Sequence, residues 1–301
     1  KKEISRYEQT GKYRTAEKHQ FILNKLEHYL KTKKNRTDIN FNELTVPFLT
    51  EYEAYLKNDL GNHQNTYYTD FKNIRTIYRN AIYQQVVEQH TYPFFQVKLH
   101  QIPSVKEKLS PDEIVTIQKL KLKEGTAIWH ARNYFLFSYY CAGMRWGDVC
   151  TLKWSNITDE QRLRYRMGKN HKLVDMELPE QALAILQYYK TPDARDSDFI
   201  FPLLKKKKDY SNPKVLKKSI SSKNTVIDRE MKNIAGLAHI RINLTFHISR
   251  HSFAFHLYLK TKDVNAVQTA LRHSSLQETQ KYLMELGATE LDSELRDFYK
   301  Q

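Results

Sequence analysis

The chain has 301 residues, with 49 Lys and Arg against 34 Asp and Glu, which gives a formal charge of +15. Its 8 glycines and 8 prolines exclude a collagen-like or low-complexity chain, and a hydrophobic content of 40% argues against disorder. Two cysteines, Cys141 and Cys150, cannot crosslink a chain of this size, so we expect a reducing compartment, the cytoplasm.

The positive charge favours a polyanionic partner, because each cation placed on a phosphate releases condensed counterions. The alternative is a basic surface that serves only solubility. The densest basic stretch, residues 203–223, includes Lys205, Lys206, Lys207 and Lys208 in succession. Such a run cannot enter a packed core, so we expect it in solvent or on nucleic acid. The longest nearly apolar run, residues 134–144, is shorter than the roughly 20 residues of a membrane span, so no membrane partner is expected.

The first hundred residues are predicted to be helical. Apolar side chains recur near the 3.6-residue period over residues 21–30 and 65–87. The sequence Thr-Val-Pro at residues 45–47 predicts a further helix start, and Gly61 its end. Three basic residues occupy exposed positions of the 65–87 helix and are expected to bind DNA: Lys72, Arg75 and Arg79. Residues 1–104 are therefore predicted to form a helical domain.

A second domain is predicted over residues 109–301. The polar stretch 101–108 has no periodicity and is the expected linker. Ser110, Pro111 and Glu113 then form a capping-box pattern that predicts a helix start. Residues 131–141 are apolar nearly all round, which predicts a buried helix.

The middle of this second domain changes to a two-residue period. Apolar and charged side chains alternate in the segments before and after residues 168–173, which predicts a β-hairpin. The helical period returns from Val226 onward. The predicted fold class is thus mainly α, with one small antiparallel sheet in the second domain.

Four short segments carry the residues that are suited to catalysis. Arg145 lies at a Gly-flanked turn just after the buried helix, and Lys169 lies in the hairpin loop. His247 and Arg250 follow in a His-x-x-Arg pattern, and His273 precedes Tyr282 by nine residues.

In order and spacing, these residues resemble the active-site signature of the tyrosine recombinases, the phage integrase family. The resemblance covers residues 109–282 at the level of motifs, and the helical first domain is similar in type to the family's core-binding domain. The sequence Arg-Asn-Ala-Ile at residues 79–82 is similar to integrases of Bacteroidota mobile elements. Since the chain begins with Lys1 rather than Met, a preceding arm-type DNA-binding domain is also expected.

The residue types suit phosphodiester cleavage independently of this resemblance. Tyr282 can supply the nucleophilic oxygen, while Arg145 and Arg250 can each hold non-bridging oxygens in a bidentate way. His247 titrates near neutrality and can exchange a proton with the tyrosine, and His273 can donate a hydrogen bond to the phosphate. No step requires a cofactor, because a phosphotyrosyl bond conserves the energy needed for rejoining.

The general acid is expected to be Lys169, with Lys172 as the alternative. Lys169 directly follows Gly168 after the first strand, in the place where the family's hairpin lysine usually lies. Lys172 lies on the return side of the loop and is expected to contact the DNA backbone.

For several residues near these motifs, a purely structural role is an alternative to a catalytic one. His247 and His251 have an i,i+4 spacing known from zinc sites, but no acidic residue lies between them, so no metal site is expected. His251 is then expected to be a packed or capping side chain. Asp148 is either a surface carboxylate or orients an active-site base or arginine. Arg272 stands where relatives of this family usually carry a glycine, directly before the histidine that corresponds to His273. This difference affects the local turn and not the chemistry.

The resemblance implies a site-specific DNA recombinase or integrase. It would act on double-stranded DNA as a homo-oligomer, a tetramer during strand exchange. The C-terminal tail, about residues 287–301, carries Leu291, Leu295 and Phe298 at i, i+4 and i+7, and is expected to dock on a neighbouring protomer. The alternatives are a type IB topoisomerase-like enzyme and a DNA-binding regulator that has lost catalysis. Fold does not choose among integration, excision and dimer resolution.

Overall fold

The computed structural model describes residues 1–98, 100–103, 105–205 and 208–287. The chain divides into two compact units, Lys1–Pro103 and Ser104–Gln301, which are described separately. The segment predicted as a linker, residues 101–108, spans this division. None of the described helices is long and apolar enough to cross a membrane.

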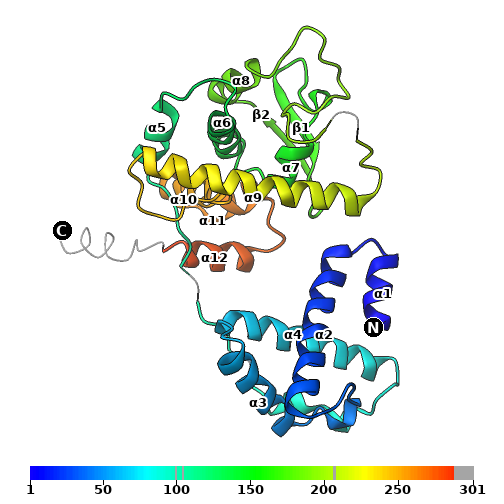
Figure 1. Cartoon of the computed structure of the whole chain (residues 1–301). Helices are drawn as coiled ribbons and strands as arrows, with labels where there is room; N and C mark the ends of the chain where they lie inside the picture. The colour runs from blue at the N-terminus through cyan, green and yellow to red at the C-terminus, as the bar shows by residue number, and fades with distance from the viewer. Residues whose placement is uncertain (99, 104, 206–207, 288–301) are drawn as a thin grey trace, which may run out of the picture. The chain divides into compact units, whose positions relative to one another are not determined.

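The first unit is a helical bundle around an aromatic core (Figure 1). Its α-helices are α1 (Lys2–Gln9), α2 (Tyr13–Lys33), α3 (Val46–Ala54) and α4 (Gln64–Tyr83). A π-helical turn, Tyr55–Asp59, extends α3, and short 3-10 turns lie at Phe41–Glu43, Gln89–Thr91 and Pro93–Phe95. The core contains the buried rings of Tyr29, Tyr52, Phe71 and Tyr78.

Local signals at the ends of these helices behave largely as the sequence predicts. The Thr45 hydroxyl accepts a hydrogen bond from the Phe48 N–H at 3.4 Å, which caps α3. Helix α4 ends at Tyr83, four residues before the predicted end, because Gln85 takes a left-handed conformation with φ of 57°. Gln84 and Gln85, the first residues beyond Tyr83, are polar and exposed.

The second unit contains helices and a two-stranded hairpin (Figure 1). Before and within the hairpin region lie α5 (Pro111–Lys119), α6 (Ala127–Tyr140), α7 (Trp146–Thr151), a 3-10 turn (Trp154–Asn156), β1 (Arg162–Arg166) and β2 (Leu173–Glu177). After it follow α8 (Glu180–Gln187), α9 (Pro213–Leu237), α10 (Ile248–Thr261), α11 (Val264–Leu271) and α12 (Leu276–Glu285).

Helix α6 forms the centre of this unit. It packs against α5, α8, α9 and α10, and its Phe135 and Phe137 are fully buried. Strands β1 and β2 pair antiparallel, with Leu163 opposite Met176. Helix α10 packs on α11, which packs on α12. The predicted class, mainly α with a small antiparallel sheet, is confirmed.

One prediction about this unit was wrong in its boundary. Helix α9 begins at Pro213, not near Val226. The Asn212 side chain caps it by accepting the Lys214 N–H at 2.9 Å, and proline suits the first turn. The early turns of α9 are largely polar and exposed, so the apolar period revealed only the later part. The second half of the lysine-rich stretch is therefore helical.

Candidate active site

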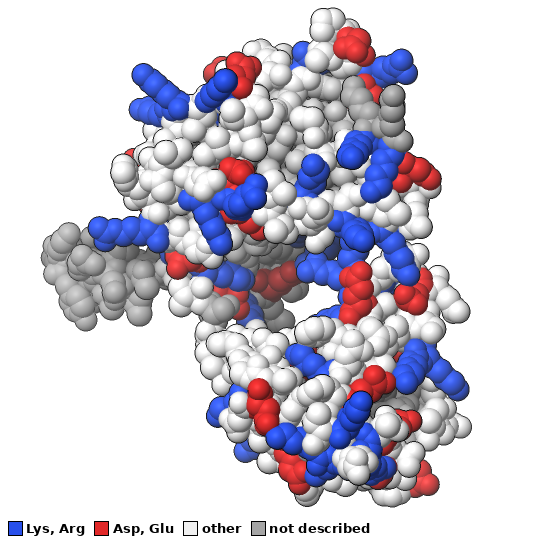
Figure 2. Space-filling view, viewed as in Figure 1, with Lys and Arg blue, Asp and Glu red and all other residues white. Residues whose placement is uncertain are grey.

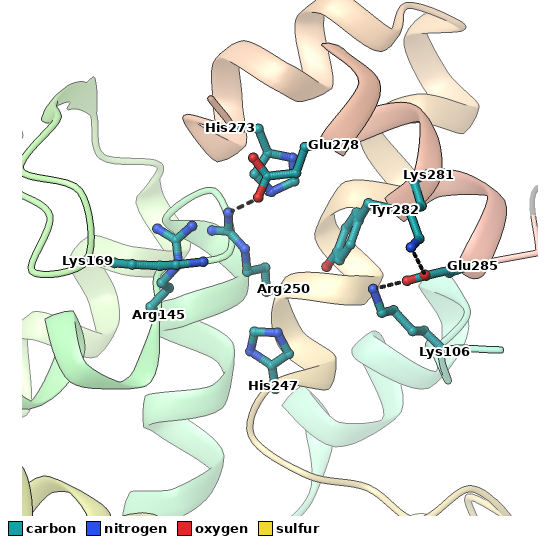
Figure 3. Close-up of a pocket in the computed structure, with 10 residues that line it drawn as sticks. All are labelled: Lys106, Arg145, Lys169, His247, Arg250, His273, Glu278, Lys281, Tyr282 and Glu285. Atoms are coloured by element: carbon teal, nitrogen blue, oxygen red, sulfur yellow. Dashed lines mark hydrogen bonds and ion pairs between the residues drawn. The ribbon is translucent and has the colours of Figure 1, made fainter. Parts of the chain in front are cut away.

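A cavity of about 300 Å³ in the second unit brings the predicted catalytic residues together (Figure 3). Its lining comes from the start of α7, the hairpin loop, the start of α10, the turn between α11 and α12, α12 itself and the segment before α5. All six predicted residues line it, along with four that the sequence did not single out: Arg145, Lys169, His247, Arg250, His273 and Tyr282, then Lys106, Glu278, Lys281 and Glu285.

Arg250 is the most firmly held of these side chains. It lies in the first turn of α10 and is only 4% exposed. Its Nη1 donates to the Gly143 carbonyl and its Nη2 to the Leu271 carbonyl, each at 2.8 Å. Burial, together with the nearby Arg145, lowers its pKa to about 10, so the guanidinium still carries its charge at neutral pH.

The turn before α7 leaves room for this arginine. Gly143 has φ of +66°, and a Cβ placed there would lie 2.9 Å from Arg250 Cγ. Only glycine, which has no Cβ, can adopt this left-handed backbone conformation without strain and also leave space for Arg250. The same turn places Arg145 at the N-cap of α7, where its Nη1 lies 3.7 Å from Met167 Sδ.

The two guanidinium groups of the cavity share one electrostatic property. Within the described part of the chain, neither Arg145 nor Arg250 forms an ion pair with a carboxylate. Two neighbouring cations that are not neutralised in this way, one of them buried, form a site suited to an oxyanion such as phosphate.

His273 lies beside this pair. It follows Arg272, whose φ of 55° is the left-handed conformation that the usual glycine would adopt freely. His273 Nε2 lies 3.4 Å from Arg250 Nη2, and Nδ1 lies 3.1 Å from Thr279 Oγ1. Burial, then Arg250, lowers the pKa of His273 to about 4, so the ring is neutral in the free protein.

The hairpin loop holds two lysines in different surroundings. Lys169 lines the cavity, whereas Lys172 Nζ donates to the carbonyls of His273 at 2.9 Å and Arg272 at 3.3 Å. Lys172, expected on the DNA backbone, therefore ties the loop to the segment that carries His273. Asp148 also holds this loop, because its Oδ1 accepts the Gly168 N–H at 2.8 Å.

Asp148 is thus not a surface carboxylate: it is only 5% exposed. Burial raises its pKa, and the hydrogen bond from Gly168 opposes that shift. Its hydrogen bond is to the backbone next to Lys169, so it orients the lysine's loop, and its carboxylate also interacts electrostatically with Arg145 and Arg250.

Tyr282 projects from α12 into the cavity (Figure 3). Ser275 caps this helix by accepting the Glu278 N–H at 3.1 Å. Burial raises the pKa of the Tyr282 phenol, and Arg250 and Arg145 oppose that shift. The Tyr282 hydroxyl lies 2.5 Å from Nδ1 of His251, a residue that the sequence analysis expected only to pack or cap.

His247, at the N-cap of α10, also lines the cavity. Its ring meets His251 edge to face, with centroids 4.6 Å apart. Burial, then Arg250 and Arg145, lowers the pKa of His247 to about 4. No hydrogen bond joins its side chain to Tyr282 in the described structure.

Lys106 is a contributor that no local pattern could reveal. Its Nζ lies 4.4 Å from the centroid of the Tyr282 ring and pairs with Glu285. Its backbone N–H donates to the Glu285 carbonyl at 2.6 Å, so the start of the unit is fastened to α12. The i,i+4 spacing of His247 and His251, in contrast, was a usable signal that both rings share one face of α10.

The predicted DNA-binding residues lie outside this cavity. Lys72 and Arg79 are exposed on α4, and Arg75 is half-buried on the same helix. Lys205 and Lys208 are exposed. Lys206, Lys207 and the tail from residue 288 onward lie outside the described residues. Among the residues that are described, no cluster of three His, Cys, Asp or Glu side chains is placed to hold a metal ion.

Comparison with known proteins agrees with this geometry. Residues 107–286 match the phage integrase family, and residues 1–98 match the phage integrase SAM-like domain. The tyrosine recombinase of Thermosipho africanus is 26% identical over 211 residues, which is 67% of this chain and 63% of that protein. Tyrosine recombinase XerD of Rhizobium meliloti is 31% identical over 147 residues, 48% of this chain and 43% of that protein. The matches therefore span less than two thirds of the length of these relatives.

Solved structures show the same fold. The XerH site-specific recombinase bound to its difH substrate superposes with a TM-score of 0.63 at 18% identity, covering 93% of this chain and 81% of that one. A lambda integrase dimer bound to a COC′ core site gives 0.66 at 16% identity, covering 95% of each chain. Since the phage integrase match alone takes in more than half of the sequence, and the fold agrees, the chain belongs to the phage integrase family.

Proposed function

We propose that this protein is a site-specific DNA recombinase that cleaves and rejoins double-stranded DNA through a 3′-phosphotyrosyl intermediate. The observation that carries the proposal is the cavity that Tyr282 lines together with two arginines, neither of which forms an ion pair with a described carboxylate. A tyrosine beside an oxyanion site is the arrangement that attack on a phosphodiester requires. The chemistry uses neither a metal nor a high-energy cofactor.

In the proposed reaction, the scissile phosphate lies between Arg145 and Arg250, which bind its non-bridging oxygens. The Tyr282 oxygen attacks phosphorus, a bond to the tyrosine forms, and the bond to the 5′ oxygen breaks. Lys169 protonates that leaving oxygen, and His273 donates a hydrogen bond to the phosphate. The phenol proton passes to a histidine of α10. Rejoining reverses each transfer.

The charge states in the free protein support these roles. Arg250 remains a cation although burial lowers its pKa to about 10. His247 and His273 are neutral at pH 7, because burial lowers the pKa of each to about 4. Neutral rings can accept protons, and a phosphate entering the cavity supplies negative charge that offsets the neighbouring cations.

DNA and a second copy of the chain are the proposed partners. Basic side chains are spread over the face drawn in Figure 2, interspersed with acidic ones, on both units. Related folds were solved as DNA complexes, including a lambda integrase tetramer bound to a Holliday junction. We infer that this chain likewise exchanges strands as a tetramer through such a junction, in the cytoplasm, with its C-terminal tail docking in trans.

The biological task that we favour is integration or excision of a mobile element, on the resemblance of residues 79–82 to integrases of Bacteroidota elements. Sequencing DNA junctions formed in cells would test this role and would identify the target site.

The central test is covalent trapping on a nicked substrate, where the released strand diffuses away and rejoining cannot occur. The protein should form a covalent adduct with DNA, and Tyr282→Phe should bind the same DNA without forming one. An adduct in the Phe variant would contradict the assignment of the nucleophile.

Covalent trapping on the nicked substrate, relaxation of a supercoiled plasmid and junction formation between two intact target sites together separate the two alternatives. A regulator without catalysis would give no adduct with the unaltered protein. A type IB topoisomerase-like enzyme would give the adduct and relax supercoils, but it would form no Holliday junction between two target sites.

A further inference from the structure

His251 contacts the atom that the proposed reaction uses as its nucleophile. Its Nδ1 lies 2.5 Å from the Tyr282 hydroxyl oxygen, and the two rings are tilted by 42° with centroids 5.3 Å apart. The residues are 31 positions apart, on α10 and α12, so the contact exists only because these helices fold together through α11. His251 is buried, with 8% of its surface exposed.

Both groups of this hydrogen bond are neutral in the free protein. Burial raises the pKa of the Tyr282 phenol, so the hydroxyl keeps its proton at neutral pH. Burial, then His247 and Lys106, lowers the pKa of His251 to about 3, so the imidazole is neutral. In the tautomer that carries its proton on Nε2, the phenol donates and Nδ1 accepts through its lone pair, and this is the tautomer that proton transfer from the phenol requires.

We propose that His251 is the proton acceptor for the Tyr282 hydroxyl during DNA cleavage and the proton donor to the same oxygen during rejoining. This inference rests on the proposed function and names a catalytic group for it. During attack, the phenolic O–H bond breaks, its electron pair forms the bond to phosphorus, and the proton moves to Nδ1. The 5′ oxygen leaves with a proton from Lys169, so one proton enters the α10 histidine as another leaves the lysine.

The charged groups around His251 explain why its basicity should rise when a phosphate binds in the cavity. The charged and titratable groups facing it are His247 and Arg250 on its own helix, Lys106 before α5, and Tyr282 on α12. The cations among them disfavour an imidazolium while the cavity is empty. A bound phosphate brings negative charge against those cations and so favours protonation of the ring.

His247 has a different position from His251. Its ring packs edge to face against that of His251 and lines the cavity. The described structure shows no hydrogen bond from the His247 side chain to the Tyr282 phenol. His247 thus supports the orientation of His251, while His251 holds the reacting hydroxyl.

The chain provides a matched control on the same helix. His256 Nδ1 lies 2.8 Å from the Tyr139 hydroxyl, and its Nε2 lies 2.8 Å from the Leu109 carbonyl. This is a second histidine of α10 bonded to a tyrosine, but Tyr139, unlike Tyr282, does not line the cavity. His256→Phe therefore reports what removing such a hydrogen bond does to folding alone.

The first measurement is the rate of covalent adduct formation on the nicked substrate. His251→Phe keeps a ring but removes the acceptor, and it should slow adduct formation by about 100-fold or more, within the range typical of proton-transfer catalysis. His251→Asn can accept a hydrogen bond but not a proton, and it should also be slow. His256→Phe should form the adduct at the rate of the unaltered protein.

The second measurement separates proton transfer from damage to the site. A strand whose 3′ phosphate is esterified with p-nitrophenol carries a leaving group that needs no proton, and a 5′-hydroxyl strand can attack it without the tyrosine. In a Tyr282→Phe background, this joining depends on the phosphate-binding residues and on Lys169, which takes the proton of the attacking 5′-hydroxyl, but not on a proton acceptor for the tyrosine. Adding His251→Phe should leave its rate unchanged.

The outcomes are distinct. Slow adduct formation with unchanged joining supports the proposal. Adduct formation at the unaltered rate in His251→Phe or in His251→Asn would overturn it, as would an equal loss in both assays, which means a structural role. If the unaltered protein forms no adduct, the proposed function itself fails.

Discussion

Arg145 and Arg250 carry the same charge but stand in different surroundings. Arg250 is buried, with two hydrogen bonds to backbone carbonyls, whereas Arg145 is half-buried and contacts a methionine sulfur. Some of the guanidinium N–H donors of Arg250 are thus already used in hydrogen bonds within the protein, whereas those of Arg145 are available to a ligand.

Substituting lysine at each position should separate the two roles. Both Arg145→Lys and Arg250→Lys should slow cleavage by about 100-fold or more, because a point charge replaces a bidentate donor. Arg250→Lys should also lower the free energy of unfolding by about 1–3 kcal/mol, since one buried carbonyl is left without its donor. Urea denaturation checks this difference. Equal stability loss in both variants would contradict the assigned surroundings.

The two hairpin lysines make a second pair at this scale. A substrate with sulfur in place of the scissile 5′ oxygen releases a thiolate, which leaves without protonation. Lys169→Ala should be slow on the ordinary substrate and rescued on this one. Lys172→Ala removes the bonds to the Arg272 and His273 carbonyls, so any decrease in rate should persist with sulfur. Rescue of Lys172→Ala alone would reverse the assignment.

At the scale of elements, the turn between α6 and α7 determines whether α10 can approach. Gly143→Ala should destabilise the second unit and abolish cleavage, because its Cβ would meet Arg250 Cγ at 2.9 Å on a left-handed backbone. Gly147 offers the control: it lies inside α7 and a Cβ there meets nothing within 4 Å. Gly147→Ala should fold as well or better, by up to about 1 kcal/mol. Thermal unfolding of both variants gives the comparison.

At the scale of the whole unit, buried histidines link stability to pH. Burial lowers the pKa of His247 and His273 to about 4 and that of His251 to about 3, whereas the unfolded chain binds these protons near 6.5. Stability should be independent of these groups above pH 6.5 and should fall as the pH drops from about 6.5 toward 5, because only the unfolded state takes up protons.

Tryptophan fluorescence isolates this effect. The three tryptophans, at residues 129, 146 and 154, all lie in the second unit, so their signal follows that unit's unfolding. In urea titrations, His251→Asn should show a shallower decrease of stability with falling pH. A free energy of unfolding that stays constant between pH 7 and 5 would contradict the neutral state of these rings.

DNA binding belongs to the molecule as a whole, and its salt dependence counts the phosphates that the protein neutralises. Replacing residues 205–208 by alanine should flatten the slope of log affinity against log salt by about 0.9 for each phosphate that is no longer neutralised. Replacing Lys119, Lys121, Lys123 and Lys190, four exposed lysines outside the predicted DNA-binding set, controls for net charge and should leave the slope unchanged. An unchanged slope in the first variant would place residues 205–208 in solvent.

Local signals in the sequence determined most of the fold. Ser110 and Glu113 form the predicted capping box, and the alternating segments form the antiparallel pair β1 and β2. These features depend on neighbouring residues, whose spacing is visible in the sequence. The polar start of α9 was missed because exposed turns carry little apolar periodicity. The residue types and order of the candidate site were likewise visible, from Arg145 to Tyr282.

Which of these residues touch one another was decided only by the tertiary structure. His251 reaches the Tyr282 hydroxyl because α10, α11 and α12 pack in succession, and Lys106 reaches the Tyr282 ring because the start of the unit runs along α12. Sequence spacing assigns a side chain to a face of its own helix, but it does not say which helix will cover that face. That choice depends on long-range packing, and here it separates the histidine that holds the nucleophile from the one beside it.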